Sequence, residues 1–473
     1  MKKMGVWMAC AMVGLAIIAC TSDRSWKLAP NASAYVTDGS SPFRQVSVAI
    51  GGKSADVVVD PARTRQTIEG FGGAFNETGW EALLSLSEKE RSEAMERLFD
   101  PTKGLALRVC RVPIGASDYA LDRYTDDETP DDYAMQHFSI ARDRKLLIPY
   151  IRAALRYQPD LMLWGSAWTP PTWMKTNDAY DEGSLRSDPR VYAAYAAYLA
   201  DFIKAYRAEG LPLNLVAVQN EPLIAQHYPS CLWTPEQFHT FVRDFMGPLF
   251  AKEGLRDAIM LGTFNESDEL PHAQGVLEDP AARKYVSVVG LQWSGIDMIP
   301  SLRSLDKEVT LWETETDCGN WPWKPGFDPV RPQNDLAYAA YTWGLMREYL
   351  EAGVSVYEMW NMVLDEHGVN LDPVRPWPQN SAVVVNTKAK TVTYTPMYYA
   401  FGSFSKFVPP GSKLVASGGF DSNAVSFVTP EGTVVVVLYN AYTQERVIRV
   451  RIAANIYRVQ MGADSFGALL VKA

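Results

Sequence analysis

Cysteine and histidine are scarce in this sequence, with five of each among 473 residues. Cys110, Cys231 and Cys318 lie beyond the amino-terminal leader without paired spacing, and the histidines form no HxxxH pattern. We therefore expect no disulfide framework and no metal site. Basic residues are also outnumbered, 45 against 55 acidic ones, and they are not clustered. A nucleic-acid partner is disfavoured, because it would require a basic face.

The apolar run from Val6 to Ala19 is shorter than the roughly 20 residues that a membrane-spanning helix needs. It follows the basic start MKK and ends in IIAC, before the polar stretch TSDRS. Residues 1–20 thus resemble a bacterial lipoprotein signal, with cleavage before Cys20 and lipidation of its thiol. An ordinary secretory signal is the alternative. We expect a protein of the bacterial cell envelope, at the outer membrane or periplasmic face, held by the lipid anchor alone.

The rest of the chain divides by its pattern of strands and helices. Residues 21–42 are predicted as a polar linker, and the β-rich ends 43–66 and 402–473 as one β-sandwich built from both termini. Residues 67–401 alternate strand-like and helix-like segments, which favours a (β/α)8 TIM barrel over a doubly wound open sheet. No GxGxxG follows the first strand, and no cofactor is indicated. The eight predicted strands are GFGGAF, LRVCRVP, LMLWGSAW, LNLVAVQN, AIMLGTFN, SVVGLQW, VTLWETE and VSVYEMWN.

The carboxyl ends of these strands carry residues typical of sugar chemistry, and catalytic groups of such barrels lie at those ends. The candidates are Arg111 on strand two, Trp168 on three, Asn220 and Glu221 on four, Gln292 and Trp293 on six, Glu313 and Glu315 on seven, and Trp360 and Asn361 on eight. Strands four and seven face each other across an eight-membered ring, so Glu221 and Glu315 could act as acid and nucleophile. Each residue also has a structural alternative as a helix cap, an ion-pair partner or a core side chain. The abundance of 14 Trp and 23 Tyr favours a carbohydrate ligand, because their rings stack on sugar C–H faces.

Strand seven offers two carboxylates on the same face, because side chains alternate along a strand. Glu315 lies nearer the end of the strand, whereas Glu313 is expected deeper among packed side chains. We therefore expect Glu315 to be the nucleophile.

Several motifs, in order along the chain, resemble glycoside hydrolase family 30 and its glucosylceramidase-like and endo-β-1,6-glucanase-like branch. They are QTIEGFGGAFNETG (66–79), LRVCRVPIGASDY (107–119), YTDDETPDDY (124–133), GSAWTPPTWMKTN (165–177), VAVQNEPL (216–223), WETETDCG (312–319) and PMYYAFGSFSKFVPPGS (396–412). The resemblance implies a barrel with a β-sandwich, no metal, and hydrolysis of β-glycosides with retention. It makes Glu221 the acid/base, Glu315 the nucleophile, and Asn220 the partner of the sugar 2-hydroxyl. Arg111, Trp168 and Trp360 match sugar-pocket positions.

The sequence departs from the family pattern in three places. Gln292-Trp293-Ser294 stands where the glucosylceramidases have His-x-Tyr, so a tyrosine near the nucleophile is missing. Glu128 stands where their ADTPDD-like stretch has an aspartate, and we expect it to hold sugar hydroxyls. The loop 364–380 also differs. We expect a β-glucan or β-glucoside substrate, with β-1,6 linkage favoured; the alternatives are a β-xyloside, β-fucoside, β-galactoside or glucosylceramide, or a non-catalytic glycan-binding lipoprotein.

Overall fold

The computed structural model describes residues 26–39, 41–328, 334–421 and 423–472. The predicted leader and Cys20 lie outside the described residues. Within the described ranges, no helix combines the length and apolarity that crossing a membrane requires.

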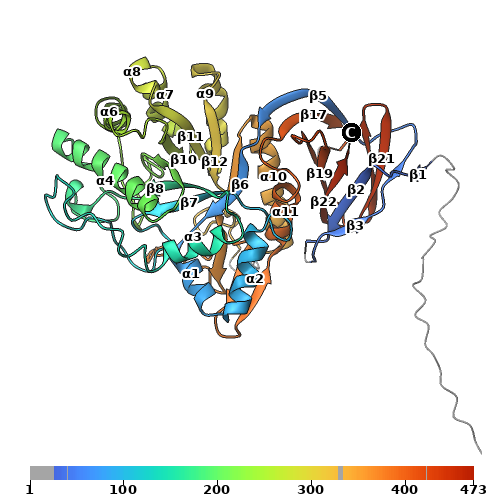
Figure 1. Cartoon of the computed structure of the whole chain (residues 1–473), viewed down its shortest axis with the longest axis horizontal. Helices are drawn as coiled ribbons and strands as arrows, with labels where there is room; N and C mark the ends of the chain where they lie inside the picture. The colour runs from blue at the N-terminus through green and yellow to red at the C-terminus, as the bar shows by residue number, and fades with distance from the viewer. Residues whose placement is uncertain (1–25, 40, 329–333, 422, 473) are drawn as a thin grey trace, which may run out of the picture.

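Eight parallel strands close into a barrel, in the order β10-β11-β12-β13-β6-β7-β8-β9 (Figure 1). They are β6 (Gly70–Ala74), β7 (Val109–Ile114), β8 (Met162–Ala167), β9 (Leu213–Ala217), β10 (Ile259–Phe264), β11 (Val286–Gln292), β12 (Thr310–Glu315) and β13 (Val356–Asn361). Each overlaps one of the eight predicted runs and extends at most one residue beyond it. The last strand pairs in parallel with the first, which closes the ring. The barrel prediction is therefore confirmed, and the open-sheet alternative is wrong.

Burial on both faces explains why these strands are almost continuously apolar. Every residue of β7 and β10 is buried, as expected for parallel strands covered by helices outside and packed side chains inside. An apolar cluster fills the interior with residues from seven successive strands: Val109, Trp164, Leu215, Ala217, Met260, Val288, Trp312 and Val356. The strand β6 requires glycine, since a Cβ at Gly72 would lie 1.3 Å from the Val109 carbonyl oxygen.

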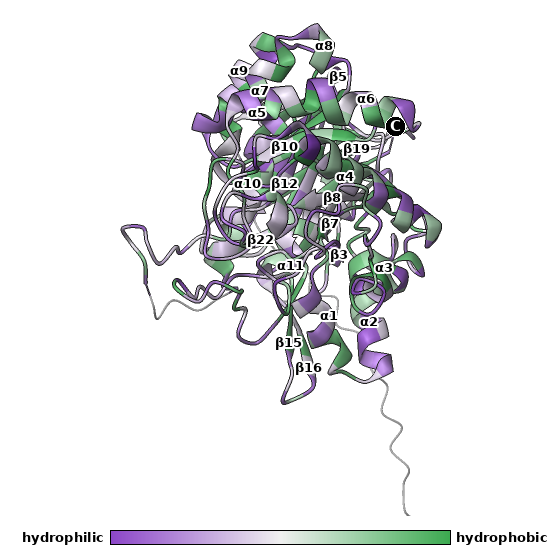
Figure 2. Cartoon of the chain, turned by 90° about the vertical axis from the view of Figure 1, so that its left-hand side faces the viewer, coloured by the Kyte–Doolittle hydropathy of each residue, from purple (hydrophilic) through white to green (hydrophobic). Residues whose placement is uncertain are grey.

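Helices surround the barrel, and Figure 2 shows hydrophilic and hydrophobic residues on single helices such as α8 and α9. They are α1 (Glu77–Leu84), α2 (Glu88–Phe99), α3 (Leu147–Leu155), α4 (Pro189–Ala208), α5 (Pro235–Thr240), α6 (Gly247–Lys252), α7 (Leu270–Leu277), α8 (Pro280–Arg283), α9 (Ile299–Leu305), α10 (Leu336–Ala352) and α11 (Pro396–Ser405). The helix-like stretch 80–98 is divided between α1 and α2. Ser87 begins α2 with a capping box to Glu90, which favours a new helix start over continuation.

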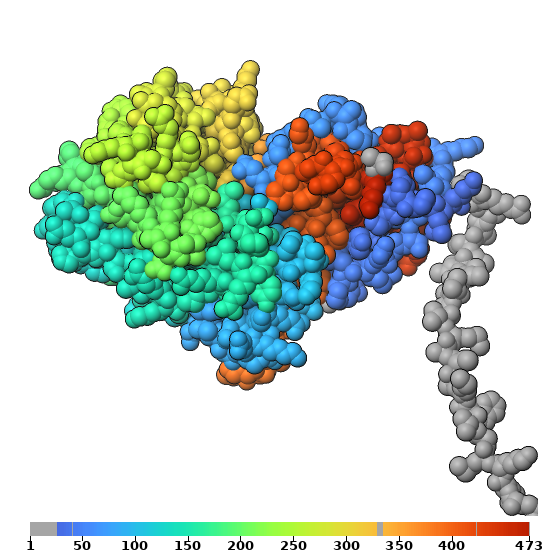
Figure 3. Space-filling model, in the orientation of Figure 1, coloured from blue at the N-terminus to red at the C-terminus, as the bar shows by residue number. Residues whose placement is uncertain are grey.

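Both ends of the chain build the second domain, a β-sandwich, as predicted. Figure 3 shows the first and last described segments packed side by side. Its sheet has the order β1-β4-β21-β20-β5-β17-β18-β19-β22-β2-β3. Its strands are β1 (Lys27–Leu28), β2 (Ala32–Thr37), β3 (Arg44–Val46), β4 (Ala49–Ile50), β5 (Val57–Thr67), β17 (Lys413–Gly419), β18 (Ala424–Val428), β19 (Val434–Asn440), β20 (Arg446–Ile452), β21 (Asn455–Met461) and β22 (Ser465–Val471). A small sheet follows the barrel: β14 (Val363–Asp365), β15 (Val383–Asn386) and β16 (Thr391–Tyr394).

The prediction of a polar linker at 21–42 is wrong for the strands β1 and β2. The strand β2 pairs antiparallel with β22 along its whole length, and Ala34 and Val36 are buried in the sandwich core. The apolar face of β2 has too few residues to give a strand pattern in the local sequence. Its pairing partner β22 lies more than 400 residues away. The sandwich also packs on the barrel, where Trp343 of α10 contacts Tyr439 of β19 at 5.6 Å between ring centroids.

Candidate active site

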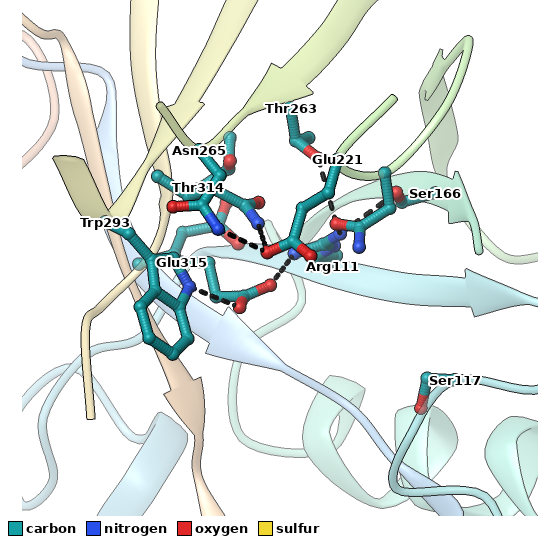
Figure 4. A network of polar contacts seen from close by, with 12 residues as sticks. Arg111, Ser117, Ser166, Glu221, Thr263, Asn265, Trp293, Thr314 and Glu315 are labelled. Carbon is teal, nitrogen blue, oxygen red and sulfur yellow. Dashed lines mark hydrogen bonds and ion pairs between the residues drawn. The ribbon is translucent and has the colours of Figure 1, made fainter. Parts of the chain in front are cut away.

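Glu221 lies just beyond β9, in a turn that directs its carboxylate over the barrel mouth. Its φ of 48° is left-handed, a conformation that costs a non-glycine residue about 1–3 kcal/mol. Hydrogen bonds hold it there. Its backbone N–H donates to Thr263 O at 3.1 Å. The amides of Asn265 and Gln292 donate to Oε1 at 2.9 and 2.7 Å (Figure 4). The turn therefore places the carboxylate with Oε1 fixed, while Oε2 has no hydrogen-bond partner in the described part of the chain.

Glu315 is the last residue of β12, and Figure 4 shows its side chain directed toward that of Glu221. Arg111 Nη1 donates to Oε2 at 2.6 Å, and Trp293 Nε1 donates to Oε1 at 2.7 Å. Arg111 also donates to the Asn220 side-chain oxygen, which links the ends of β7, β9 and β12. The indole of Trp293, in the segment that departs from the His-x-Tyr pattern, thus supplies a donor to this carboxylate.

The two carboxylates have different electrostatic surroundings. Burial raises the pKa of Glu221 well above its usual range, and the charges of Glu315 and Glu269 add to this effect. Burial also raises the pKa of Glu315, but the Arg111 cation and the Trp293 donor act against it. Among the described residues, Glu221 accepts hydrogen bonds from neutral amides, which leaves its proton favoured, whereas the cation beside Glu315 favours the ionised form of that carboxylate. Such a division is the pattern of a general acid beside a nucleophile.

Glu313 lies below the site, with its side chain 1% exposed. Its two oxygens accept the backbone N–H groups of Glu315 at 3.1 Å and Glu358 at 2.9 Å. It therefore supports the ends of β12 and β13 and does not line the pocket.

Two stacked indoles form the floor of the site. The rings of Trp168 and Trp360 lie 5.4 Å apart at 29°. The Arg111 guanidinium lies 4.3 and 5.3 Å from their centroids, and Arg111 is fully buried. Cation–π contacts and the ion pair to Glu315 stabilise this buried charge.

The predicted site residues occupy three different places. Trp168, Asn220, Glu221, Trp293, Glu315 and Trp360 line the pocket. Arg111, Gln292 and Asn361 lie beneath or behind this lining and contact it through hydrogen bonds. Glu128 is not in the pocket. Its carboxylate accepts the Thr125 N–H and hydroxyl and the Tyr180 hydroxyl, so it closes a local turn.

The pocket also contains residues that the sequence did not single out. Asp118 is 4% exposed and its Oδ1 has no hydrogen-bond partner among the described residues. Burial and the charge of Glu315 raise the pKa of Asp118 to about 7. It lies four residues beyond the end of β7, inside the segment LRVCRVPIGASDY. The sequence did not indicate it, because the candidates were taken from the ends of the predicted strands. Asn265 was also missed, although it is the last residue of the predicted run AIMLGTFN and directly follows β10.

Loops supply the remaining lining, largely polar and aromatic. It comprises Ile224, Ala225, Gln226, Tyr228, Glu266, Ser294, Trp321, Trp323, Lys324, Asn370, Asp372, Arg375, Trp377 and Gln379. Only Ile224 and Ala225 among these are aliphatic. Among the residues that the structure describes, no group of three or more His, Cys, Asp or Glu side chains could hold a metal ion.

Family profiles match both domains. The Glycosyl hydrolase family 30 TIM-barrel domain matches residues 68–408, and the Glycosyl hydrolase family 30 beta sandwich domain matches residues 411–467. The chain belongs to glycosyl hydrolase family 30. As a family 30 member it is a glycoside hydrolase, which confirms the resemblance seen in the motifs.

Similar proteins include two kinds of family 30 enzyme. The chain is 31% identical over 412 residues to "Lysosomal acid glucosylceramidase" of Mus musculus, covering 82% of this chain and 78% of that protein. It is 25% identical over 476 residues to "Endo-1,6-beta-D-glucanase neg1" of Aspergillus fumigatus, covering 91% and 92%. Among solved structures, SrfJ from Salmonella typhimurium has a TM-score of 0.82 at 25% identity, covering 93% and 100%. The endo-beta1,6-glucanase BT3312 has a TM-score of 0.79 at 22% identity, covering 94% and 100%, and this likeness concerns the fold.

Proposed function

We propose that this family 30 enzyme hydrolyses β-glucosidic bonds with retention, using Glu221 as acid/base and Glu315 as nucleophile. The observation that carries the proposal is the unequal environment of two facing carboxylates. Arg111 and Trp293 stabilise charge on Glu315. Glu221 is buried, receives only neutral donors, and has the more strongly raised pKa.

The reaction follows from this division. A Glu315 oxygen attacks the anomeric carbon as the bond to the leaving oxygen breaks, and Glu221 transfers its proton to that oxygen. A glycosyl ester on Glu315 results. Glu221, now ionised, removes a proton from water, whose oxygen attacks the anomeric carbon and releases Glu315. Asn220, fixed by Arg111, faces the pocket where it can bind the 2-hydroxyl of the reacting sugar.

A β-glucan or β-glucoside is the proposed substrate, with β-1,6 linkage favoured. Relatives named for endo-1,6-β-glucanase activity support this choice, as does a lining with only two aliphatic residues. Trp168 and Trp360 line the pocket, and Asp118 Oδ1, which has no hydrogen-bond partner among the described residues, offers an acceptor for a sugar hydroxyl. The alternatives with the same mechanism are β-xyloside, β-fucoside, β-galactoside and glucosylceramide. Product analysis on β-1,3-, β-1,4- and β-1,6-glucans and aryl glycosides separates them.

The acid role is tested with Glu221→Ala on alkyl and nitrophenyl β-glucosides. General acid catalysis contributes about 10²–10⁴-fold, so alkyl glucoside hydrolysis should fall by that factor. The loss in the first step should be much smaller for nitrophenyl glucoside, whose leaving group needs little protonation, and azide should rescue turnover and yield a β-glycosyl azide. Equal losses on both substrates would contradict the assignment.

We also propose, from the leader alone, that the enzyme is a lipoprotein of the bacterial envelope. The sequence IIAC before TSDRS supports lipidation at Cys20. Metabolic labelling with palmitate should mark the wild-type protein and not Cys20→Ser. Equal labelling of both would contradict the anchor.

A further inference from the structure

The buried side chains of Trp168, Trp360 and Arg111 close the pocket on one side. In the proposed mechanism the reacting sugar lies between Glu221 and Glu315, above this floor. Whatever is attached to the leaving oxygen must therefore extend toward solvent, through the loops that form the pocket mouth.

Three of these loops meet through one arginine. Arg375, in the loop between β14 and β15, donates from Nη2 to Oε1 of Gln226 at 2.7 Å. Gln226 belongs to the loop that follows Glu221. The Arg375 guanidinium also lies 5.2 Å from the ring centroid of Trp323, which belongs to the loop after β12. The loops that follow β9, β12 and β14 are thus joined at the pocket mouth by contacts of the Arg375 side chain.

Trp323 is 47% exposed, an unusual position for a residue of its size. Its ring meets Trp377 edge-on, with centroids 5.0 Å apart at 84°, and Trp377 is itself buried. This contact supports the ring and leaves about half of its surface open at the pocket mouth. A supported, exposed indole beside amide and guanidinium donors suits the C–H face and the hydroxyls of a sugar.

The charges at the mouth favour a neutral ligand. Arg375 Nε lies 3.5 Å from Asp372 Oδ2, so the two opposite charges partly offset each other. Asp118, Glu266 and Asp372 line the pocket together with two cationic side chains, Lys324 and Arg375, so charges of both signs are present. An anionic group would meet these carboxylates, and an acyl chain would meet few aliphatic side chains.

We propose that Gln226, Trp323 and Arg375 form a binding site for a neutral pyranose on the leaving-group side. The sugar stacks on Trp323 and accepts hydrogen bonds from Arg375 and the Gln226 amide. This inference rests on the proposed function, and it assigns a saccharide, not a lipid, as the leaving group that the site selects.

The test compares kcat/KM on a β-linked diglucoside, nitrophenyl β-glucoside and octyl β-glucoside. Trp323→Ala and Arg375→Ala should each lower the ratio of diglucoside to nitrophenyl glucoside by about 10-fold or more, because a stacking face or a charged donor is lost. Trp323→Phe should recover part of the ratio. Phe420→Ala, at a 98% exposed aromatic in the sandwich, is the control and should leave it unchanged.

Equal losses on all three substrates, or an unchanged ratio, would overturn the proposal. So would a selective loss on octyl glucoside, which would assign an apolar leaving group to the mouth. If the wild-type enzyme cleaves no β-glucoside, the proposed function fails. Calorimetry of the diglucoside with Glu315→Gln then tests the mouth site separately. Trp323→Ala in that background should weaken binding about 10-fold, and unchanged affinity would refute the site.

Discussion

Removing the indole donor from Glu315 should alter the pH dependence of catalysis. Trp293 Nε1 donates to Glu315 Oε1 at 2.7 Å and stabilises the ionised nucleophile. The donor is held in place because Trp293 has a left-handed φ of 50° and its carbonyl accepts the Tyr349 hydroxyl at 2.8 Å. Trp293→Phe keeps an aromatic ring but removes the N–H together with part of the indole. The pKa of Glu315 should therefore rise.

The size of the effect follows from the hydrogen bond. A bond to a charged group is worth about 1.5–3 kcal/mol, which corresponds to about 10- to 150-fold in a protonation equilibrium. Trp293 is only half-buried, so the lower end is expected. On the acidic limb, kcat/KM follows the ionised fraction of Glu315 and should fall by that factor. At higher pH, where Glu315 is ionised in both proteins, the loss in kcat/KM should be smaller, because Arg111 still pairs with the carboxylate.

The assay is kcat/KM for nitrophenyl β-glucoside from acidic to alkaline pH. Trp343→Phe is the matched control, because it also shrinks an indole to a phenyl ring, here at a buried position whose Nε1 has no hydrogen-bond partner among the described residues. The control should leave the acidic limb in place. An unmoved acidic limb in Trp293→Phe, or a loss that is equal at every pH, would refute the role assigned to this hydrogen bond.

Two other variants test the neighbouring carboxyl groups. Glu313→Gln should retain turnover within about 10-fold, because one backbone acceptor remains, whereas Glu315→Gln should lose at least about 10³-fold; the reverse order in kcat would move the nucleophile to Glu313. Asp143 is buried, accepts the Tyr124 and Tyr206 hydroxyls at 3.1 and 2.6 Å, and has a pKa raised by burial to about 7. Because the pKa of this carboxyl is raised in the folded state, its contribution to the free energy of unfolding is fully present below about pH 4. That contribution is lost as pH rises toward 7. Asp143→Asn should therefore stabilise the protein at pH 8, by up to about 4 kcal/mol, with little gain at pH 4 in urea unfolding; an equal effect at both pH values would contradict this.

Periodicity and strand-end chemistry were sufficient to predict the barrel and much of its site. All eight strands matched their apolar runs because parallel strands are buried on both faces. Glu221 and Glu315 were found because the carboxyl ends of the barrel strands meet at one rim. The sequence also separated Glu315 from Glu313 by depth, and Glu313 is indeed occupied with backbone N–H groups.

What the sequence missed depends on loops and on distant pairing. Asp118 reaches the pocket from a loop, whereas Glu128 turns back onto Thr125, and no spacing rule distinguishes these two acids. The segment 32–37 forms a strand only because the last strand of the chain lies beside it. The left-handed turn at Trp293 brings its indole to the nucleophile, an orientation that strand alternation does not predict.

The most direct test of the two-carboxylate mechanism is to trap the glycosyl-enzyme. A 2-fluoro-β-glucosyl fluoride should inactivate the enzyme, because fluorine slows both steps while the good leaving group allows the first. Peptide mass spectrometry should then place one fluoroglucosyl ester on Glu315, and reactivation should accompany its loss. An adduct on Glu313 or Glu221, or catalytic turnover that inverts the anomeric configuration without any adduct, would contradict the mechanism.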